Sequence, residues 1–189
     1  MVALVGACGP GVVRELTVSS APVPPGTYTR PAFRPAVTLE LHEGWTPVNG
    51  FDDFFDVERD VGSPDVIAVQ IACPRGFVGR AGVQPADTPG QAHVVLSENP
   101  GLTMGPSNDC RIGGLVGQVF DVENGSGRHV GIMELSPGTL GIDPGRKLRI
   151  ACFSTPHGLV AVMVGGSVAR WKDAEAAAQP VLDSIRFTP

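Results

Sequence analysis

The sequence predicts an α+β domain with an antiparallel β-sheet, and three observations lead to this fold class. Residues 147–154 alternate between the two faces of a strand, and residues 159–164 are continuously apolar. The turn between them, residues 155–158, contains Pro and Gly and is too short for a parallel crossover. Two helical patterns, at 88–99 and 169–183, lie outside the apolar strands. We expect this hairpin in the middle of the core, with its second arm covered on both faces.

Further strands are expected on both sides of this hairpin in the sequence. Residues 66–73 are dense in β-branched side chains and should form a central strand that ends before Pro74. Phe55 and Val57 alternate with Asp56 and Glu58, which predicts a half-buried strand with an acidic outer row. The other expected strands cover residues 28–33, 36–41, 112–122 and 130–135.

Local signals define the two helices. Thr88 is a good N-cap, Pro89 suits the first helical position, and Gln91 completes a capping box. Pro100 ends that segment. The helix at 169–183 has a small apolar face rich in Ala, and Pro180 should kink it because Pro removes a backbone donor.

Size and composition indicate one globular domain. The chain has 189 residues, of which 42% are hydrophobic and 17% charged, and its 25 Gly and 18 Pro imply many turns. A net charge of -5 with only 14 Lys and Arg offers no basic stripe, so nucleic acid is not an expected partner. No apolar run approaches the roughly 20 residues that span a bilayer.

The first residues contain a lipobox-like pattern. Val5, Gly6 and Ala7 precede Cys8, but a basic region and a longer apolar stretch before them are lacking. Either this start lies inside a longer signal and Cys8 is lipidated, or Cys8 is an ordinary cysteine. We expect the first, an extracytoplasmic protein anchored to the membrane through Cys8, or otherwise secreted. Residues 1–25 would be the leader and a flexible Pro/Gly linker, and residues 26–189 a single α+β domain.

Several motifs in this order resemble one family. They are GTYTRPAFRPAVTLELHEGW, ENPGLTMG, IGGLVGQVFDV and AAAQPVLDSIRF. Together they resemble PsbP-like domains, in particular actinobacterial exported lipoproteins of the LpqN type. The resemblance implies a three-layer α/β/α sandwich and binding or accessory roles, and it implies no catalytic residue.

Two clusters that suggest ligand chemistry have simpler explanations. Gly113, Gly114 and Gly117 lie within an expected strand with no helix after it, so a bulge or close packing of a helix on the sheet is favoured over a phosphate loop. The acidic residues of 52–60 lack the spacing of a calcium loop. We interpret them as a solvated strand edge.

The histidines and cysteines give no metal or cofactor site. His157 lies in the hairpin turn, and none of His42, His93, His129 and His157 has metal-ligand spacing. In an oxidising compartment, Cys73 and Cys110 are the preferred disulfide candidates. Cys152 should point inward from the middle of a strand.

Three functional hypotheses follow. The leading one is a non-enzymatic binding or accessory domain of the bacterial cell envelope, whose partner would be an envelope protein. The second is a carrier of a small apolar ligand, held in a cleft that Gly113, Gly114 and Gly117 leave between sheet and helix. The third is a hydrolase-type enzyme that uses His157 with a neighbouring carboxylate or thiol.

Overall fold

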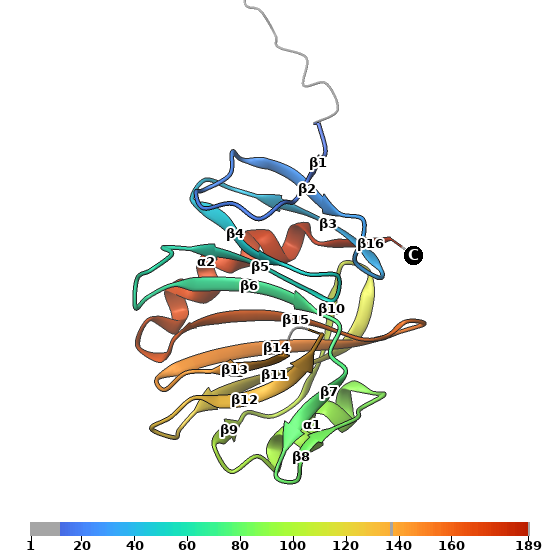
Figure 1. Cartoon of the computed structure of the whole chain (residues 1–189), viewed down its shortest axis with the longest axis vertical. Coiled ribbons are helices and arrows are strands. Elements are labelled where there is room, and N and C mark those ends of the chain that lie inside the picture. Colours follow the sequence, from blue (N-terminus) through green and yellow to red (C-terminus); the bar gives the residue numbers. More distant parts are fainter. Residues whose placement is uncertain (1–11, 137, 189) are drawn as a thin grey trace, which may run out of the picture.

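A computed structural model describes residues 12–136 and 138–188, and these residues form three sheets and two α-helices (Figure 1). The central sheet has eight strands in the order β10-β11-β14-β15-β6-β5-β4, with β9 paired to β11. Two four-stranded sheets have the orders β1-β2-β3-β16 and β13-β12-β7-β8. The strands are β1 (Arg14–Glu15), β2 (Gly26–Arg30), β3 (Ala36–Leu41), β4 (Trp45–Gly50), β5 (Phe54–Arg59), β6 (Ile67–Ala72), β7 (Gly76–Gly79), β8 (Gly82–Gln84), β9 (Leu102–Met104), β10 (Asn108–Ile112), β11 (Leu115–Asn124), β12 (Val130–Leu135), β13 (Gly138–Ile142), β14 (Arg146–Thr155), β15 (Gly158–Ser167) and β16 (Arg186–Thr188). The α-helices are α1 (Pro89–Ser97) and α2 (Trp171–Ser184), and a 3-10 turn, η1 (Val168–Arg170), precedes α2.

The hairpin of β14 and β15 lies in the middle of the central sheet, as the sequence predicts. The two strands pair antiparallel from Arg146 with Ser167 to Thr155 with Gly158. Leu159 belongs to one hydrophobic core and Val160 to the other, and the alternation continues along β15. The second arm is continuously apolar because both of its faces are buried.

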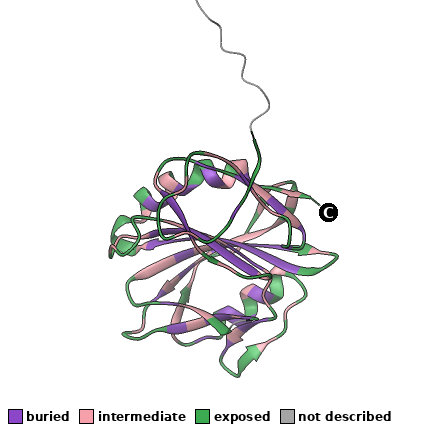
Figure 2. Cartoon of the chain, turned by 45° about the horizontal axis from the view of Figure 1, so that its top comes forward, coloured by how far each residue is buried: buried purple, intermediate pink, exposed green. Residues whose placement is uncertain are grey.

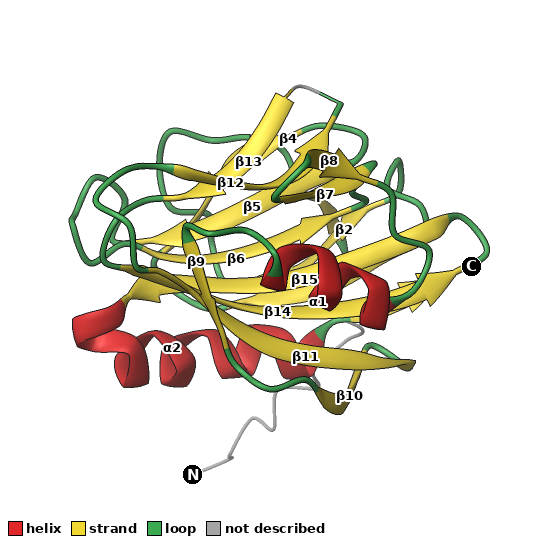
Figure 3. Cartoon of the chain, turned by 90° about the horizontal axis from the view of Figure 1, so that it is seen from below, coloured by secondary structure: helices red, strands yellow, loops and turns green. Residues whose placement is uncertain are grey.

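Two hydrophobic cores lie on opposite faces of the central sheet. Strands β2 and β3 and helix α2 cover one face, and α1 with β7, β12 and β13 covers the other. Figure 3 shows α1 and α2 on opposite sides of the sheet, and Figure 2 shows buried residues along its strands. The antiparallel sheet with flanking helices agrees with expectation. The molecule is nevertheless mostly β, because small sheets cover much of each face, and a three-layer α/β/α sandwich is not confirmed.

Both helices form where their local signals place them. The Thr88 side chain accepts from the backbone N–H of Gln91, and the Gln91 side chain accepts from the backbone N–H of Thr88, each at 3.2 Å. This reciprocal cap satisfies donors at the start of α1. Pro180 lies inside α2, which buries Ala174, Ala178 and Val181. Within the described residues, no helix is long and apolar enough to cross a membrane.

The packed part of the chain begins before Gly26, the boundary expected from the sequence. Strand β1 pairs with β2 in parallel, and Leu16 is only 2% exposed in the core. The backbone N–H of Val23 donates to the carbonyl of Trp45 at 2.9 Å. The described part of the expected linker packs because its apolar side chains reach the core. Cys8 lies outside the described residues.

The expected strand 112–122 corresponds mainly to β11, and its first residues are instead the end of β10 and a tight turn. Gly113 and Gly114 have φ values of 59° and 89°, which glycine adopts readily, and they connect β10 to β11. Gly117 lies within β11, where a Cβ atom would overlap the carbonyl oxygen of Cys152. Gly117 is therefore close to the neighbouring strand β14 and not to a helix, and Gly113 and Gly114 form a hairpin turn.

Candidate functional site

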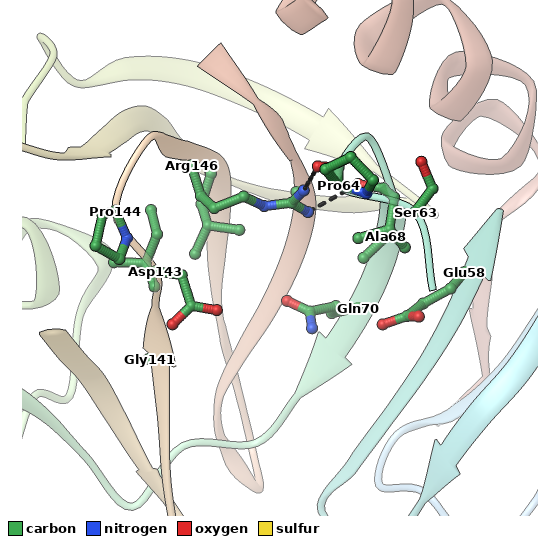
Figure 4. A pocket seen from close by; sticks show the side chains of 13 residues that line it. Glu58, Ser63, Pro64, Ala68, Gln70, Gly141, Asp143, Pro144 and Arg146 are labelled. Carbon is green, nitrogen blue, oxygen red and sulfur yellow. Dashed lines mark hydrogen bonds between the residues drawn. The ribbon is translucent and has the colours of Figure 1, made fainter. Parts of the chain in front are cut away.

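A polar groove of about 400 Å³ opens on the central sheet, on the face that carries α1. Strands β5, β6, β14 and β15 form its floor, and the 63–66 loop and the end of β13 form its walls. We define the polar groove by the residues Glu58, Ser63, Pro64, Val66, Ala68, Gln70, Gly141, Ile142, Asp143, Pro144, Arg146, Leu148 and Gly165 (Figure 4).

The floor is hollow because its central positions carry small side chains. Glu58 pairs with Ala68, Ala68 with Gly165, and Gly165 with Leu148, so these residues form one row across four strands. A Cβ atom at Gly165 would lie 3.0 Å from Leu148 Cδ2. Glycine at this position therefore lets the Leu148 side chain pack directly over β15, and the small Ala68 side chain beside it keeps the floor low.

Arg146 holds one wall in place. Its Nη1 donates to the carbonyl of Pro64 at 3.2 Å, and its Nη2 donates to the carbonyl of Val66 at 2.7 Å. Burial lowers the pKa of Arg146, although the charges of Glu58, Asp143 and Asp65 oppose this effect. The guanidinium thus fixes the loop and leaves fewer donors for a ligand.

The expectation that β5 carries an acidic row exposed to solvent is wrong for Asp56. Strand β5 lies between β4 and β6, and Asp56 is only 2% exposed. Its Oδ1 accepts from the backbone N–H of Asn49 at 2.8 Å, and both carboxylate oxygens accept from Asn49 Nδ2. Burial raises the pKa of Asp56, and these hydrogen bonds offset part of that rise. Neighbouring strands, which the local pattern does not reveal, remove this side chain from solvent.

Glu58 is a half-buried carboxylate in the groove. Burial raises its pKa, and the like charge of Asp56 raises it further, while Arg146 lowers it. Within residues 12–136 and 138–188, Glu58 has no salt bridge or side-chain hydrogen bond. Figure 4 shows Asp143, Gln70 and Glu58 in a row along the groove. The site offers hydrogen-bond acceptors and an amide above a small apolar floor.

One rim residue of the groove is paired with a histidine. His129 Nδ1 lies 2.7 Å from Asp143 Oδ1, and both side chains are largely exposed. Sequence spacing gives no signal for this pair, because 14 residues and a bulged hairpin separate its members. Among the described residues, no three His, Cys, Asp or Glu side chains converge as a metal site.

His157 lies at the far end of the central hairpin from the groove. The hairpin arms have ten residues each, which corresponds to about 30 Å. Its backbone N–H donates to Thr155 Oγ1 at 3.1 Å, and within the described chain its exposed ring has no carboxylate or thiol partner. His93 instead meets the carbonyl of Gly105 at 3.1 Å, and His42 is exposed.

The structure does not bring Cys73 and Cys110 together. The three described cysteines, Cys73, Cys110 and Cys152, are free thiols. Cys110 lies on β10 and Cys73 directly after β6, with β11, β14 and β15 between them. Four strand spacings amount to roughly 19 Å, whereas a disulfide needs Cα atoms within about 7 Å. Cys152 is fully buried, as expected.

The cleft expected at the glycine cluster has a different character. Gly113 packs against Ile185 and Phe187, so it brings the turn close to the chain after α2. A groove of about 380 Å³ does lie between this turn and α2, but charged and amide side chains line much of it. These residues are Arg111, Gln179, Asp183 and Arg186.

Comparisons with known proteins give distant structural matches. No family model matches the chain, and no curated protein matches it. The chain is similar to the solution structure of the cyanobacterial PsbP protein CyanoP from Synechocystis sp. PCC 6803, with a TM-score of 0.47 and 11% identity over 97% of this chain and 99% of that one. It is also similar to LpqN of Mycobacterium tuberculosis, a protein involved in cell envelope biogenesis. That match has a TM-score of 0.42 and 9% identity over 89% of this chain and 90% of that one.

Both matches are to proteins of the kind that the sequence motifs resemble. At such TM-scores and identities the similarity concerns the arrangement of strands and helices, and it extends to no ligand or activity.

Proposed function

We propose that this chain is a non-enzymatic binding domain of the bacterial cell envelope that holds a small polar ligand in the polar groove. The observation that carries this proposal is a preformed groove of about 400 Å³ with the half-buried Glu58 carboxylate above a floor of Ala68 and Gly165. Ligand pockets commonly have volumes of about 300 to 1,000 Å³ and a few placed polar groups. The polar lining favours a polar ligand over the apolar one considered from the sequence.

The contacts in the groove favour binding over catalysis. Ser63 supplies a hydroxyl group to the lining of the groove. Its Oγ accepts a hydrogen bond from the backbone N–H of Asp65 at 3.1 Å. No histidine lines the groove. A nucleophile needs an adjacent base within hydrogen-bond reach, and this arrangement supplies none among the described residues.

The envelope location rests on the sequence. The motif Val5, Gly6, Ala7 and Cys8, and the resemblance to exported lipoproteins, support a lipid anchor at Cys8. Metabolic labelling with a palmitate analogue in the native host tests it. We expect labelled wild-type protein in the membrane fraction and no label on a Cys8→Ala variant. A wild-type protein that is unlabelled and cytosolic would contradict the anchor.

The binding role is tested by filling the groove. The Ala68→Met variant places a longer side chain on the floor, and Val83→Met, at a 51% exposed position on β8, is its matched control. Equilibrium dialysis against a native envelope extract, followed by mass spectrometry of small molecules, compares the three proteins. We expect a compound enriched by the wild type and by Val83→Met but not by Ala68→Met.

Two further results decide this experiment. Near-ultraviolet circular dichroism checks that the Ala68→Met variant keeps its native fold. If this variant is not folded, Gly165→Ala, which adds one methyl group to the floor, replaces it in the experiment. Equal enrichment by wild type and groove-filled variants would exclude the groove as the binding site, and so would no enrichment by any of them.

A further inference from the structure

We infer that the polar groove selects an organic cation, a primary ammonium group on a short alkyl stem. The ammonium would lie against Glu58 and Gln70, and the stem would lie on Ala68 and Gly165. This inference rests on the proposed function and names the ligand class of the same site.

The charges around the groove favour a cation. Four carboxylates, those of Asp56, Glu58, Asp65 and Asp143, act on the groove or its Arg146 wall. The guanidinium groups that oppose them are those of Arg146 and of Arg170, which lies next to Asp65. An anion would be repelled by this surplus of negative charge, and a neutral ligand would gain only hydrogen bonds.

Glu58 differs from the other carboxylates in what it contacts. Asp56 accepts from Asn49, Asp143 meets His129 at 2.7 Å, and Asp65 lies 3.6 Å from Arg170 Nη1. Glu58 has no such partner in the part of the chain that the structure describes. A half-buried carboxylate without a partner is costly, so an ammonium ligand would supply the missing countercharge.

Arg146 limits but does not cancel this preference. Its Nη1 and Nη2 donate to the carbonyls of Pro64 and Val66, so the guanidinium is directed toward the loop. Among the described residues no salt bridge joins it to Glu58, and it acts on that carboxylate only through its charge. The space next to Glu58 is therefore left to a ligand.

The pH dependence of binding follows from the groups that face Glu58. Asp56 on β5 raises its pKa and Arg146 on β14 lowers it, while Asp143, His129 and Asp65 lie at the rim and in the loop. The opposing residue on β4, Thr46, is uncharged. An ammonium binds the ionised carboxylate, so affinity should rise as pH increases through the pKa of Glu58.

Nitrogen-15 NMR of the full chain tests the inference with three probes of equal length. These are butylammonium, butanol and butyrate. We expect saturable shifts of the Gln70 side-chain amide and the Ala68 and Gly165 backbone amides with butylammonium, at least tenfold weaker binding of butanol, and no binding of butyrate. Glu58→Gln should weaken butylammonium binding at least tenfold, whereas Glu43→Gln, an exposed turn residue, should leave it unchanged.

The outcomes separate this inference from the proposed function. Butylammonium binding that Glu58→Gln leaves intact would overturn the inference, and so would equal binding of butanol. If no probe binds while Ala68→Met still abolishes capture from the extract, the ligand is not an organic cation, but the groove remains the binding site. If neither experiment shows binding, both proposals fail.

Discussion

Asp121 on β11 and Arg149 on β14 face each other across an antiparallel pair and share two parallel hydrogen bonds. Arg149 Nε donates to Oδ1 at 2.7 Å and Nη2 donates to Oδ2 at 3.0 Å. Lys147 Nζ lies 3.0 Å from the same carboxylate. Both cations also lie over the Trp171 ring, at 5.1 and 5.6 Å from its centroid. The cluster ties the start of α2 to β14.

The first prediction is that Asp121 stabilises the fold above acidic pH. Burial raises the pKa of Asp121, but hydrogen bonds and charges from Arg149 and Lys147 outweigh burial and hold the pKa below its usual range. A carboxyl whose pKa is depressed in the folded state stabilises above its unfolded pKa, and this contribution is lost as pH falls through the folded pKa.

The Asp121→Asn variant should therefore be less stable at pH 7 by about 1 kcal/mol, and this difference should shrink below pH 4. Urea unfolding at pH 7 and pH 3 measures it. Asp109→Asn, an exposed position on β10, is the control and should not change the free energy of unfolding. The same difference at both pH values would show that the pair contributes nothing through charge.

A second prediction concerns the coupling of Asp56 and Glu58. The charge of Asp56 contributes to the raised pKa of Glu58, so Asp56→Asn should lower the pKa of Glu58. Carbon-13 NMR titration of the Glu58 carboxyl measures this change, with the exposed Asp52→Asn as control. An unchanged titration of Glu58 would mean that the charge of Asp56 does not contribute to its pKa, which burial and Arg146 would then determine.

The raised pKa values of Asp56 and Glu58 change the stability with pH in the opposite direction to the lowered pKa of Asp121. A carboxyl with a raised folded pKa contributes stability that is present below the unfolded pKa and is lost as pH rises through the folded pKa. The free energy of unfolding should therefore decrease less between acidic and neutral pH in the Asp56→Asn variant than in the wild type. Urea unfolding over the same pH range shows whether this decrease is smaller than in the wild type.

A third prediction tests the packed segment before Gly26. Leu16 is 2% exposed, so Leu16→Ala should lower the free energy of unfolding by about 2 kcal/mol or more. Val18→Ala, at a 56% exposed position two residues later, should change it by less than about 0.5 kcal/mol. Chemical denaturation compares the two variants. Equal, small effects would mean that residues 12–25 do not belong to the folded unit.

A fourth prediction concerns the thiols. Burial raises the pKa of Cys73 and of Cys152 to about 12, so both should react slowly at pH 8 in the folded protein, because the thiolate is the nucleophile. In a Cys8→Ser background, Ellman's reagent should titrate three thiols per chain after denaturation without reductant. A single titratable thiol would instead support the disulfide between Cys73 and Cys110.

Features that depend on neighbours in the sequence were predictable from the sequence. The hairpin of β14 and β15, the strand β6 and the cap of α1 follow from alternation, β-branching and the spacing of Thr88 and Gln91. Each arises from residues within one element or one turn, where periodicity and capping operate. The structure agrees with all three.

Tertiary structure alone decided the groove and the fate of the acidic residues. Glu58, Ala68 and Gly165 come together only through the pairing of β5 with β6 and of β6 with β15, across nearly a hundred residues of sequence for the second pair. The same pairing places β5 inside the sheet and buries Asp56. A local pattern reports which face of a strand a side chain occupies. The pattern does not report which strands lie beside that strand. The side chains of those neighbouring strands determine whether the face meets solvent, the core or a groove.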